Sequence, residues 1–88
     1  MNNKYELEFL LGSHKGSFKN KNEILNYKEC GCFYCKKIFF SSEIVDWNKE
    51  NDAEETAICP KCGIDSVLSE KYPISDNLFL IEMYKYWF

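Results

Sequence analysis

Apolar and polar residues alternate at the start of the chain. Within residues 4–11, every second side chain is apolar: Tyr5, Leu7, Phe9 and Leu11. A period of two predicts a half-buried strand. Leu10 interrupts the alternation, so a short helix remains an alternative. The polar, glycine-containing segment 12–22 predicts a loop, and Asn22 can cap a short helix that follows it.

The middle of the chain predicts a strand followed by a helix. Residues 36–40, "KKIFF", contain an apolar run suited to a strand. Ser41 can accept a hydrogen bond from the first turn of a helix, and Glu43 suits the positive end of the helix dipole. The buried side of this helix would be apolar: Ile44, Val45 and Trp47. The charged segment 48–55, "NKENDAEE", then predicts an exposed connection.

The last segment, 75–88, predicts an apolar helix that begins at Ser75. Its apolar residues follow the spacing of one helix face: Leu80, Met83, Tyr84, Trp87 and Phe88. Further apolar residues cover most of the other faces. At about 100° per residue, Leu78 and Trp87 point in nearly opposite directions. We therefore expect the helix either to pair with a second copy or another protein, or to close the core of the domain.

Length and composition restrict the class of protein. A chain of 88 residues predicts one domain, 1–88, with a marginal core that benefits from a metal or disulfides. Neither a secretory signal nor a membrane span is visible, so we expect no membrane association and a cytoplasmic location. In a reducing compartment, clustered cysteines bind metal more often than they form disulfides. Five cysteines, an odd number, also disfavour a complete disulfide set.

Two cysteine pairs carry the strongest chemical signal. Cys32 and Cys35 form one C-x2-C pair, Cys59 and Cys62 form the second, and the whole pattern is C-x2-C-x23-C-x2-C. Two tight turns can present four thiolates to one ion in a tetrahedron, which suits Zn²⁺. Gly63 fits a turn that needs positive φ. The pattern predicts a zinc-binding module over residues 28–70.

Four residues outside the two cysteine pairs are further candidates for a chemical role: His14, Cys30, Asp65 and Ser66. Cys30 can be a small apolar residue, a ligand in place of Cys32, or a redox thiol; we favour the first because the four paired cysteines complete a site. His14, the only histidine, is not needed as a ligand. Asp65 and Ser66 are the only further candidates for catalysis, and turn formation explains them more simply.

These elements together predict a small α+β zinc-binding domain. The expected fold is zinc-ribbon-like, with two cysteine knuckles, a helix between them and a C-terminal helix. A treble-clef-like arrangement is the alternative.

Three blocks of the sequence resemble a known family. They are "CGCFYC" at 30–35, "SSEIVDW" at 41–47 and "ETAICPKCGIDSVL" at 55–68; the segment "SHKGSF" at 13–18 and the ending "YKYWF" at 84–88 add to them. The chain resembles a family of small bacterial cytoplasmic proteins that are zinc-ribbon-like and whose activity is not established. The resemblance implies a zinc-ribbon-like domain with these cysteines as ligands: Cys32, Cys35, Cys59 and Cys62.

The favoured function is a non-enzymatic zinc protein that acts as a protein-interaction or adaptor module. The alternative is a nucleic-acid-binding zinc ribbon that uses the basic segment 14–28, with Phe18 and Tyr27 available for stacking. Residues 41–88 carry ten acidic residues against four lysines, and this acidity disfavours nucleic acid. A rubredoxin-like iron electron carrier is less favoured, because Lys36 stands where the first knuckle would need a glycine to match Gly63.

Overall fold

The computed structural model describes residues 4–88, so the first three residues of the predicted domain 1–88 lie outside the described part. The chain forms three α-helices, two short 3-10 turns and five strands within that part. In chain order they are α1 (Leu7–His14), η1 (Lys15–Ser17), α2 (Lys21–Leu25), β1 (Glu29–Cys32), β2 (Ile38–Phe40), η2 (Ser41–Glu43), β3 (Trp47–Lys49), β4 (Glu55–Ala57), β5 (Val67–Ser69) and α3 (Asn77–Trp87). The α+β class that the sequence predicts is confirmed.

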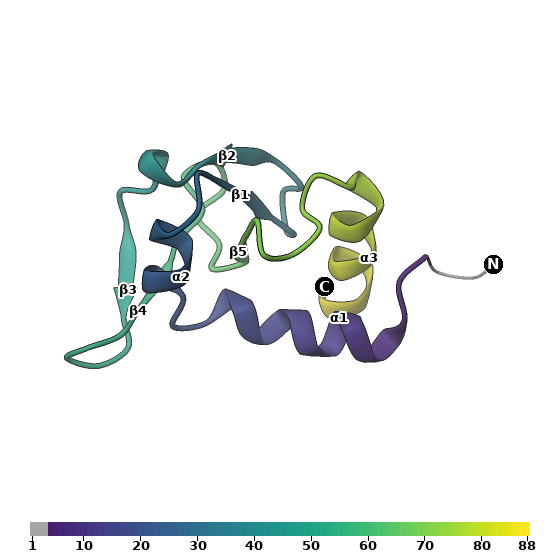
Figure 1. Cartoon of the computed structure of the whole chain (residues 1–88), viewed down its shortest axis with the longest axis horizontal. Helices are drawn as coiled ribbons and strands as arrows, with labels where there is room; N and C mark the ends of the chain where they lie inside the picture. The colour runs from purple at the N-terminus through teal and green to yellow at the C-terminus, as the bar shows by residue number, and fades with distance from the viewer. Residues whose placement is uncertain (1–3) are drawn as a thin grey trace.

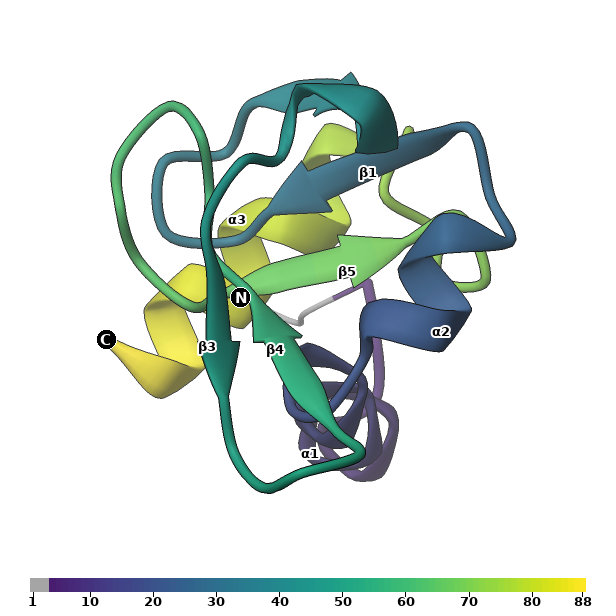
Figure 2. The same ribbon diagram turned by 90° about the vertical axis from the view of Figure 1, so that its left-hand side faces the viewer.

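The strands form two antiparallel sheets. β1 lies between β2 and β5 in the first sheet, and Cys30 stands opposite Phe39 on one side and Ser69 on the other. β3 and β4 form a separate hairpin. Figure 1 shows α1 running along the molecule, with α3 near one end and the β3–β4 hairpin at the other. Figure 2 looks onto the hairpin and shows α2 beside it.

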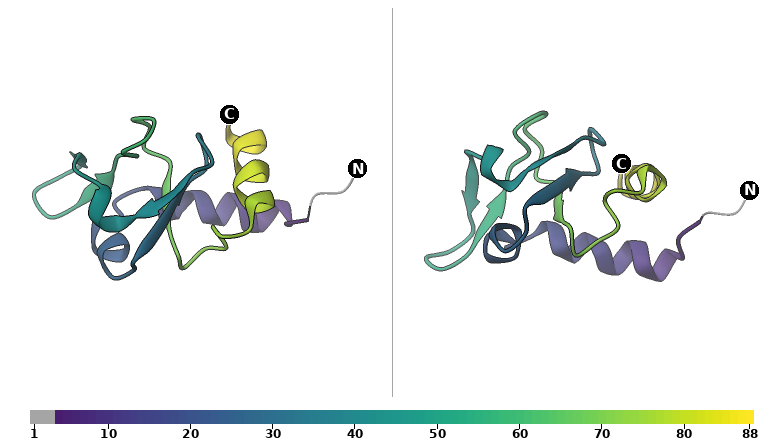
Figure 3. Two further views of the ribbon diagram at one scale, coloured as in Figure 1. Left: turned by 90° about the horizontal axis from the view of Figure 1, so that it is seen from above. Right: turned by 45° about the horizontal axis from the view of Figure 1, so that its top comes forward.

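The first sheet separates two hydrophobic clusters. Successive residues of a strand point to opposite faces, and β5 uses both: Val67 packs into one cluster and Leu68 into the other. The first cluster has Ile24 of α2 on the same side as the cysteines. The second cluster joins the helices, with Leu10 of α1 against Phe79 of α3. Figure 3 shows the helical end and the hairpin end on opposite sides of this sheet.

The predicted strand over residues 4–11 is wrong, because this segment leads into helix α1. Leu10, the residue that broke the alternation, is the anchor of the helix and is only 1% exposed. Leu7 and Leu11, which the alternating pattern placed inside, are half exposed. A helix buries residues at a spacing of three or four, and Leu10 with Ser13 fits that spacing. The alternative of a short helix is therefore the one that the structure adopts.

The predicted helix at Ser41 is also wrong, because the segment forms only one 3-10 turn. Glu43 accepts a hydrogen bond from the backbone of Phe40, and Val45 is 79% exposed rather than buried. The chain then forms β3, because the acidic segment that follows turns back and lets β3 pair with β4. The Asn51 side chain accepts hydrogen bonds from two backbone N–H groups of the turn, and so closes the hairpin.

The C-terminal helix forms, but it begins later than predicted. α3 is capped by Asp76, whose side chain accepts a hydrogen bond from the backbone of Leu78. One face of α3 is buried in the second cluster by Phe79, Leu80 and Met83. The short α2, in contrast, begins earlier than predicted: its cap position is Asn20 rather than the predicted Asn22. Within residues 4–88, no helix combines the length and the apolar character that a membrane crossing requires.

Candidate metal centre

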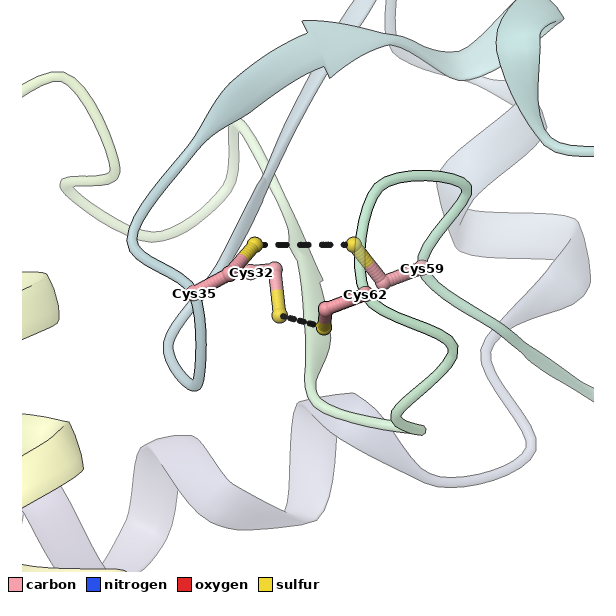
Figure 4. A group of neighbouring side chains, drawn as sticks. All are labelled: Cys32, Cys35, Cys59 and Cys62. Carbon is pink, nitrogen blue, oxygen red and sulfur yellow. Dashed lines mark hydrogen bonds between the residues drawn. The ribbon is translucent and has the colours of Figure 1, made fainter.

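Four cysteine side chains converge between the two sheets. The Sγ atoms of Cys32, Cys35, Cys59 and Cys62 all lie within 4.8 Å of one another, and two pairs, Cys32–Cys62 and Cys35–Cys59, are 3.7 Å apart. Figure 4 shows that Cys32 and Cys35 come from one loop and Cys59 and Cys62 from another, and that their side chains point toward each other. A metal with bonds of about 2.3 Å to four tetrahedral sulfurs would set them about 3.8 Å apart. The tetrad therefore has the dimensions of a four-thiolate metal site.

The two pairs sit on turns with the same hydrogen-bond pattern. In the first turn, the N–H of Lys36 donates to the carbonyl of Cys32, and the N–H of Tyr34 lies 3.4 Å from the Cys32 sulfur. In the second turn, Gly63 donates in the same way to Cys59, and the N–H of Lys61 lies 3.3 Å from the sulfur of Cys59. Each turn therefore aims one backbone dipole at a sulfur, which stabilises the thiolate form.

Different secondary-structure elements hold the two turns. The first turn connects β1 to β2 at the end of their hairpin. The second turn follows β4 and leads toward β5, which pairs with β1. The common strand β1 therefore fixes the two turns relative to each other, although they are far apart in the sequence.

Burial opposes charge on most of the tetrad when no metal is bound. It raises the pKa of the Cys32 thiol, and it raises the pKa of Cys59 to about 11. The pKa of Cys35 is lowered: burial works in the opposite direction, but hydrogen bonds from the Lys37 backbone and the neighbouring thiols outweigh it. Thiols bound to a metal lose their protons. A divalent cation bound to the four sulfurs would displace their protons and offset the negative charge of the resulting thiolates.

Cys30 lies outside the tetrad. Its side chain is fully buried in the cluster that contains Ile24 and Phe39. Burial raises the pKa of its thiol to about 12, so it is a neutral, weakly reactive group. Of the three roles considered from the sequence, a small apolar residue fits this environment.

The remaining candidates lie elsewhere. His14 is not part of the tetrad; its ring packs on Trp87 with 3.9 Å between the ring centres. Asp65 and Ser66 line a pocket with His14, so the structure brings His14 together with two adjacent residues that are distant from it in the sequence. Sequence reasoning did not find this arrangement, because no local pattern links α1 to the segment after the second turn.

The basic segment 14–28 does not present its lysines as one free patch. Lys19 pairs with Glu54 at 3.5 Å, and Lys21 pairs with Glu55 at 3.0 Å. Both acidic partners belong to the β3–β4 hairpin, so the acidic segment neutralises part of the basic one.

Lys36 is a residue whose role the sequence did not reveal. It has φ of 63°, close to the value of 80° at Gly63, and its ammonium group lies 3.8 Å from the centre of the Tyr84 ring. Lys36 thus adopts the backbone conformation for which a glycine was expected. The absence of a glycine after Cys35 therefore does not prevent the two turns from having the same geometry.

Comparison with protein-family models, curated proteins and solved structures found no match to this chain, so the resemblance noted from its sequence stays a prediction.

Proposed function

We propose that the chain is a structural zinc-binding domain in which Cys32, Cys35, Cys59 and Cys62 hold one Zn²⁺. The observation that carries the proposal is the convergence of the four sulfurs, which all lie within 4.8 Å of one another, with two of the distances at 3.7 Å. Four protein ligands leave no position for water or substrate, and closed sites of this kind are structural rather than catalytic. The role that we propose for the site is therefore structural and non-enzymatic.

The arrangement of the turns supports a zinc-ribbon-like fold. One turn closes the β1–β2 hairpin, and the other precedes β5 of the same three-stranded sheet. A treble-clef-like fold would take ligands from a helix. It has less support, because the helix that follows the second turn, α3, begins only at Asn77.

The metal would stabilise a domain that has little stability to spare. Structural zinc contributes on the order of 10 kcal/mol to folding in small domains. This is comparable to the whole stability of a typical domain, about 5–15 kcal/mol. The first cluster packs directly around the cysteines, with Ala57 and Val67 among the residues that surround them. Loss of the metal is therefore expected to loosen this half of the molecule.

A protein-interaction role is the favoured use of this scaffold. Several apolar side chains of α1 and α3 remain between 40% and 51% exposed: Leu7, Phe9, Leu11, Leu78 and Tyr86. Burial of such side chains against a partner is favourable by about 25 cal/mol per Å². A second copy of the chain is the simplest partner for Leu78, which projects from α3 away from the second cluster.

Nucleic-acid binding is the weaker alternative. It would use the lysines of segment 14–28, but two of these are already paired with Glu54 and Glu55. Binding that depends on phosphate contacts falls steeply with salt. A mobility shift that disappears between low and physiological salt would favour this alternative.

The metal site is tested by native mass spectrometry of the purified chain and of two cysteine variants. Cys59→Ser removes a ligand and should abolish stoichiometric metal. Cys30→Ser changes an equally buried cysteine outside the tetrad, and its metal content should match that of the unchanged protein. Retention of one metal in Cys59→Ser, or its loss in Cys30→Ser, would contradict the ligand assignment.

Zinc and iron are separated by colour. The same four thiolates could hold iron, as in a rubredoxin-like carrier. An iron site absorbs visible light because thiolate-to-iron charge transfer is allowed, whereas Zn²⁺ has a filled d shell and is colourless. Zinc predicts no visible absorption from protein purified without added metal. A red protein with iron in proportion to chain would establish the alternative.

The interaction role is tested by sedimentation of the zinc-loaded protein. Leu78→Ser removes an exposed apolar side chain and is expected to dissociate a dimer without loss of zinc. Val45→Ser, on the far end of the molecule and 79% exposed, is the matched control. A monomer at all concentrations would exclude self-association through this residue.

A further inference from the structure

A second site-like feature lies away from the cysteines, where three distant segments meet. His14 and Phe18, near the end of α1, line it together with Asp65 and the C-terminal residues Trp87 and Phe88. The pocket is open and has a volume of about 260 Å³. The proposed zinc function does not use any of these residues.

Two of the three aromatic rings at the pocket are held in place by other contacts. Trp87 packs on His14, and its indole N–H donates to the carbonyl of Leu10 at 3.4 Å. The Phe88 ring lies 4.8 Å from the ring of Tyr34, which belongs to the first cysteine turn. The third ring, Phe18, is 52% exposed. Trp87 is therefore the fixed wall of the pocket, whereas Phe18 and Phe88, which is 57% exposed, form its open rim.

Asp65 is the one acidic side chain among the residues that line the pocket, and His14 is the one basic side chain. Asp65 is exposed, and it makes no ion pair or side-chain hydrogen bond with residues 4–88. No lysine or arginine lines the pocket. The faces of aromatic rings attract cations as well. Carboxylate and rings together are complementary to a cation that has an apolar outer surface.

The size of the pocket limits the ligand. Pockets for drug-sized molecules and cofactors span about 300–1,000 Å³, so this one suits a small group rather than a nucleotide. The Phe18 ring already meets one cation of the chain, since the Lys19 ammonium lies 5.2 Å from its centre. A ligand cation would therefore have to use the other face of this ring or take the place of the Lys19 ammonium.

We propose that the pocket binds a small organic cation of the methylated-ammonium class. The cation sits against the rings of Phe18, Trp87 and Phe88, and Asp65 supplies the counter-charge. Aromatic rings beside a carboxylate recognise such groups because a methylated ammonium ion is weakly hydrated and spreads its charge over its methyl groups. The site is independent of the metal centre in its chemistry.

The test is an NMR titration of the zinc-loaded protein with choline. The neutral alcohol in which carbon replaces the ammonium nitrogen of choline has the same shape and is the matched ligand control. Choline is expected to give saturable shifts, in the millimolar range, at the indole N–H of Trp87 and at the backbone of Asp65. The alcohol is expected to give none. Equal binding of the two ligands, or no saturable shift with choline, would overturn the proposal.

Two variants assign the binding to this pocket. Phe18→Ala should weaken choline about two- to fivefold, the effect of losing one exposed cation–π contact. Asp65→Asn should weaken choline and leave the alcohol unaffected. The controls are Phe40→Ala, a ring that is 47% exposed elsewhere, and Asp52→Asn in the β3–β4 hairpin. Unaltered choline affinity in both pocket variants would place the binding elsewhere and refute the assignment.

Discussion

Lys36 and Gly63 occupy the same position in the two cysteine turns, and both have left-handed backbone conformations, with φ of 63° and 80°. Each follows the second cysteine of its pair, and each donates its N–H to the carbonyl of the first cysteine. The turn geometry, not the residue type, is what the two positions share. Glycine adopts this conformation at no steric cost, whereas lysine does so at a cost of about 1–2 kcal/mol.

Substitutions at the first turn should reveal this cost. Lys36→Met keeps a side chain in the strained conformation and removes the cation contact with Tyr84. Lys36→Gly removes the same contact and also relieves the backbone. We therefore expect Lys36→Gly to be more stable than Lys36→Met by about 1 kcal/mol, measured by thermal unfolding of the zinc-loaded protein. Equal midpoints for the two variants would show that this turn carries no backbone strain.

Gly63→Ala is the corresponding change in the second turn. A Cβ at this position would meet no atom within 4 Å, so only the backbone conformation opposes it. The expected loss is about 1–2 kcal/mol. Gly12→Ala, where a Cβ also meets nothing and the backbone is helical, is the control and should not be destabilising. A Gly63→Ala protein as stable as the original would contradict the argument.

Asn20→Ala should be among the most destabilising changes outside the tetrad. The Asn20 amide is 4% exposed and bridges three parts of the fold. It donates to the carbonyls of Gly16 and Val67, and it accepts from the N–H of Ala57. Because buried partners would lose their hydrogen bonds, we expect a loss of about 3 kcal/mol. Chemical denaturation measures it.

The matched control for this change is Asn22→Ala, two residues further along in α2 and exposed. A surface substitution of this kind is expected to change stability by less than about 0.5 kcal/mol. A similar, small effect of both alanine variants would mean that the Asn20 bridge contributes little.

Metal removal is predicted to loosen α3 as well as the cysteine turns. Phe33 stands between two cysteines of the tetrad, yet its side chain is buried in the second cluster with Phe79 of α3. Hydrogen exchange should show that chelation lowers protection in the first turn and in α3. The hairpin turn around Asn51 is exposed and lies outside both hydrophobic clusters, so it serves as the internal reference. Unchanged protection of α3 after chelation would show that the two clusters are uncoupled.

Asp76 links stability to acid pH. Its pKa is lowered to about 2, first by the hydrogen bond from Lys4 and then by that from Tyr5. A lowered carboxylate pKa gives a contribution that is present above the ordinary value near 3.8 and is lost as the pH falls through about 2. Tyr5→Phe removes one donor, so the Asp76 pKa should rise. Carbon NMR of the carboxyl group measures it, and an unshifted titration would contradict the contact.

The same pair predicts an alkaline effect of opposite sign. The hydrogen bond to Asp76, followed by burial, raises the pKa of Tyr5 to about 12. A raised tyrosine pKa contributes stability that is present below about 10 and is lost as the pH rises through about 12. Burial also raises the pKa of Tyr72, so ultraviolet titration should find Tyr5 among the tyrosines that ionise late. In Asp76→Asn, Tyr5 is expected to ionise earlier.

The sequence determined the features that depend on short-range patterns. The spacing of the two C-x2-C pairs identified the four cysteines that come together, because two residues between cysteines form a tight turn regardless of context. The strand at 38–40 and the C-terminal helix also followed from local pattern. The cap is Asp76 rather than the predicted Ser75. Either side chain can accept a hydrogen bond from the first turn, so the local sequence does not decide between the two positions.

Only the tertiary structure decided the features that depend on distant partners. The apolar residues of segment 7–14 are compatible with a strand and with a helix. The helix forms because it places Leu10 between α3 and the sheet. The segment after Ser41 becomes part of a hairpin because β3 can pair with β4. The pocket around His14 and Asp65 has no local signature at all, since its walls come from three segments. Local energies of strand and helix differ by a few tenths of a kcal/mol per residue, and burial of one large side chain outweighs them.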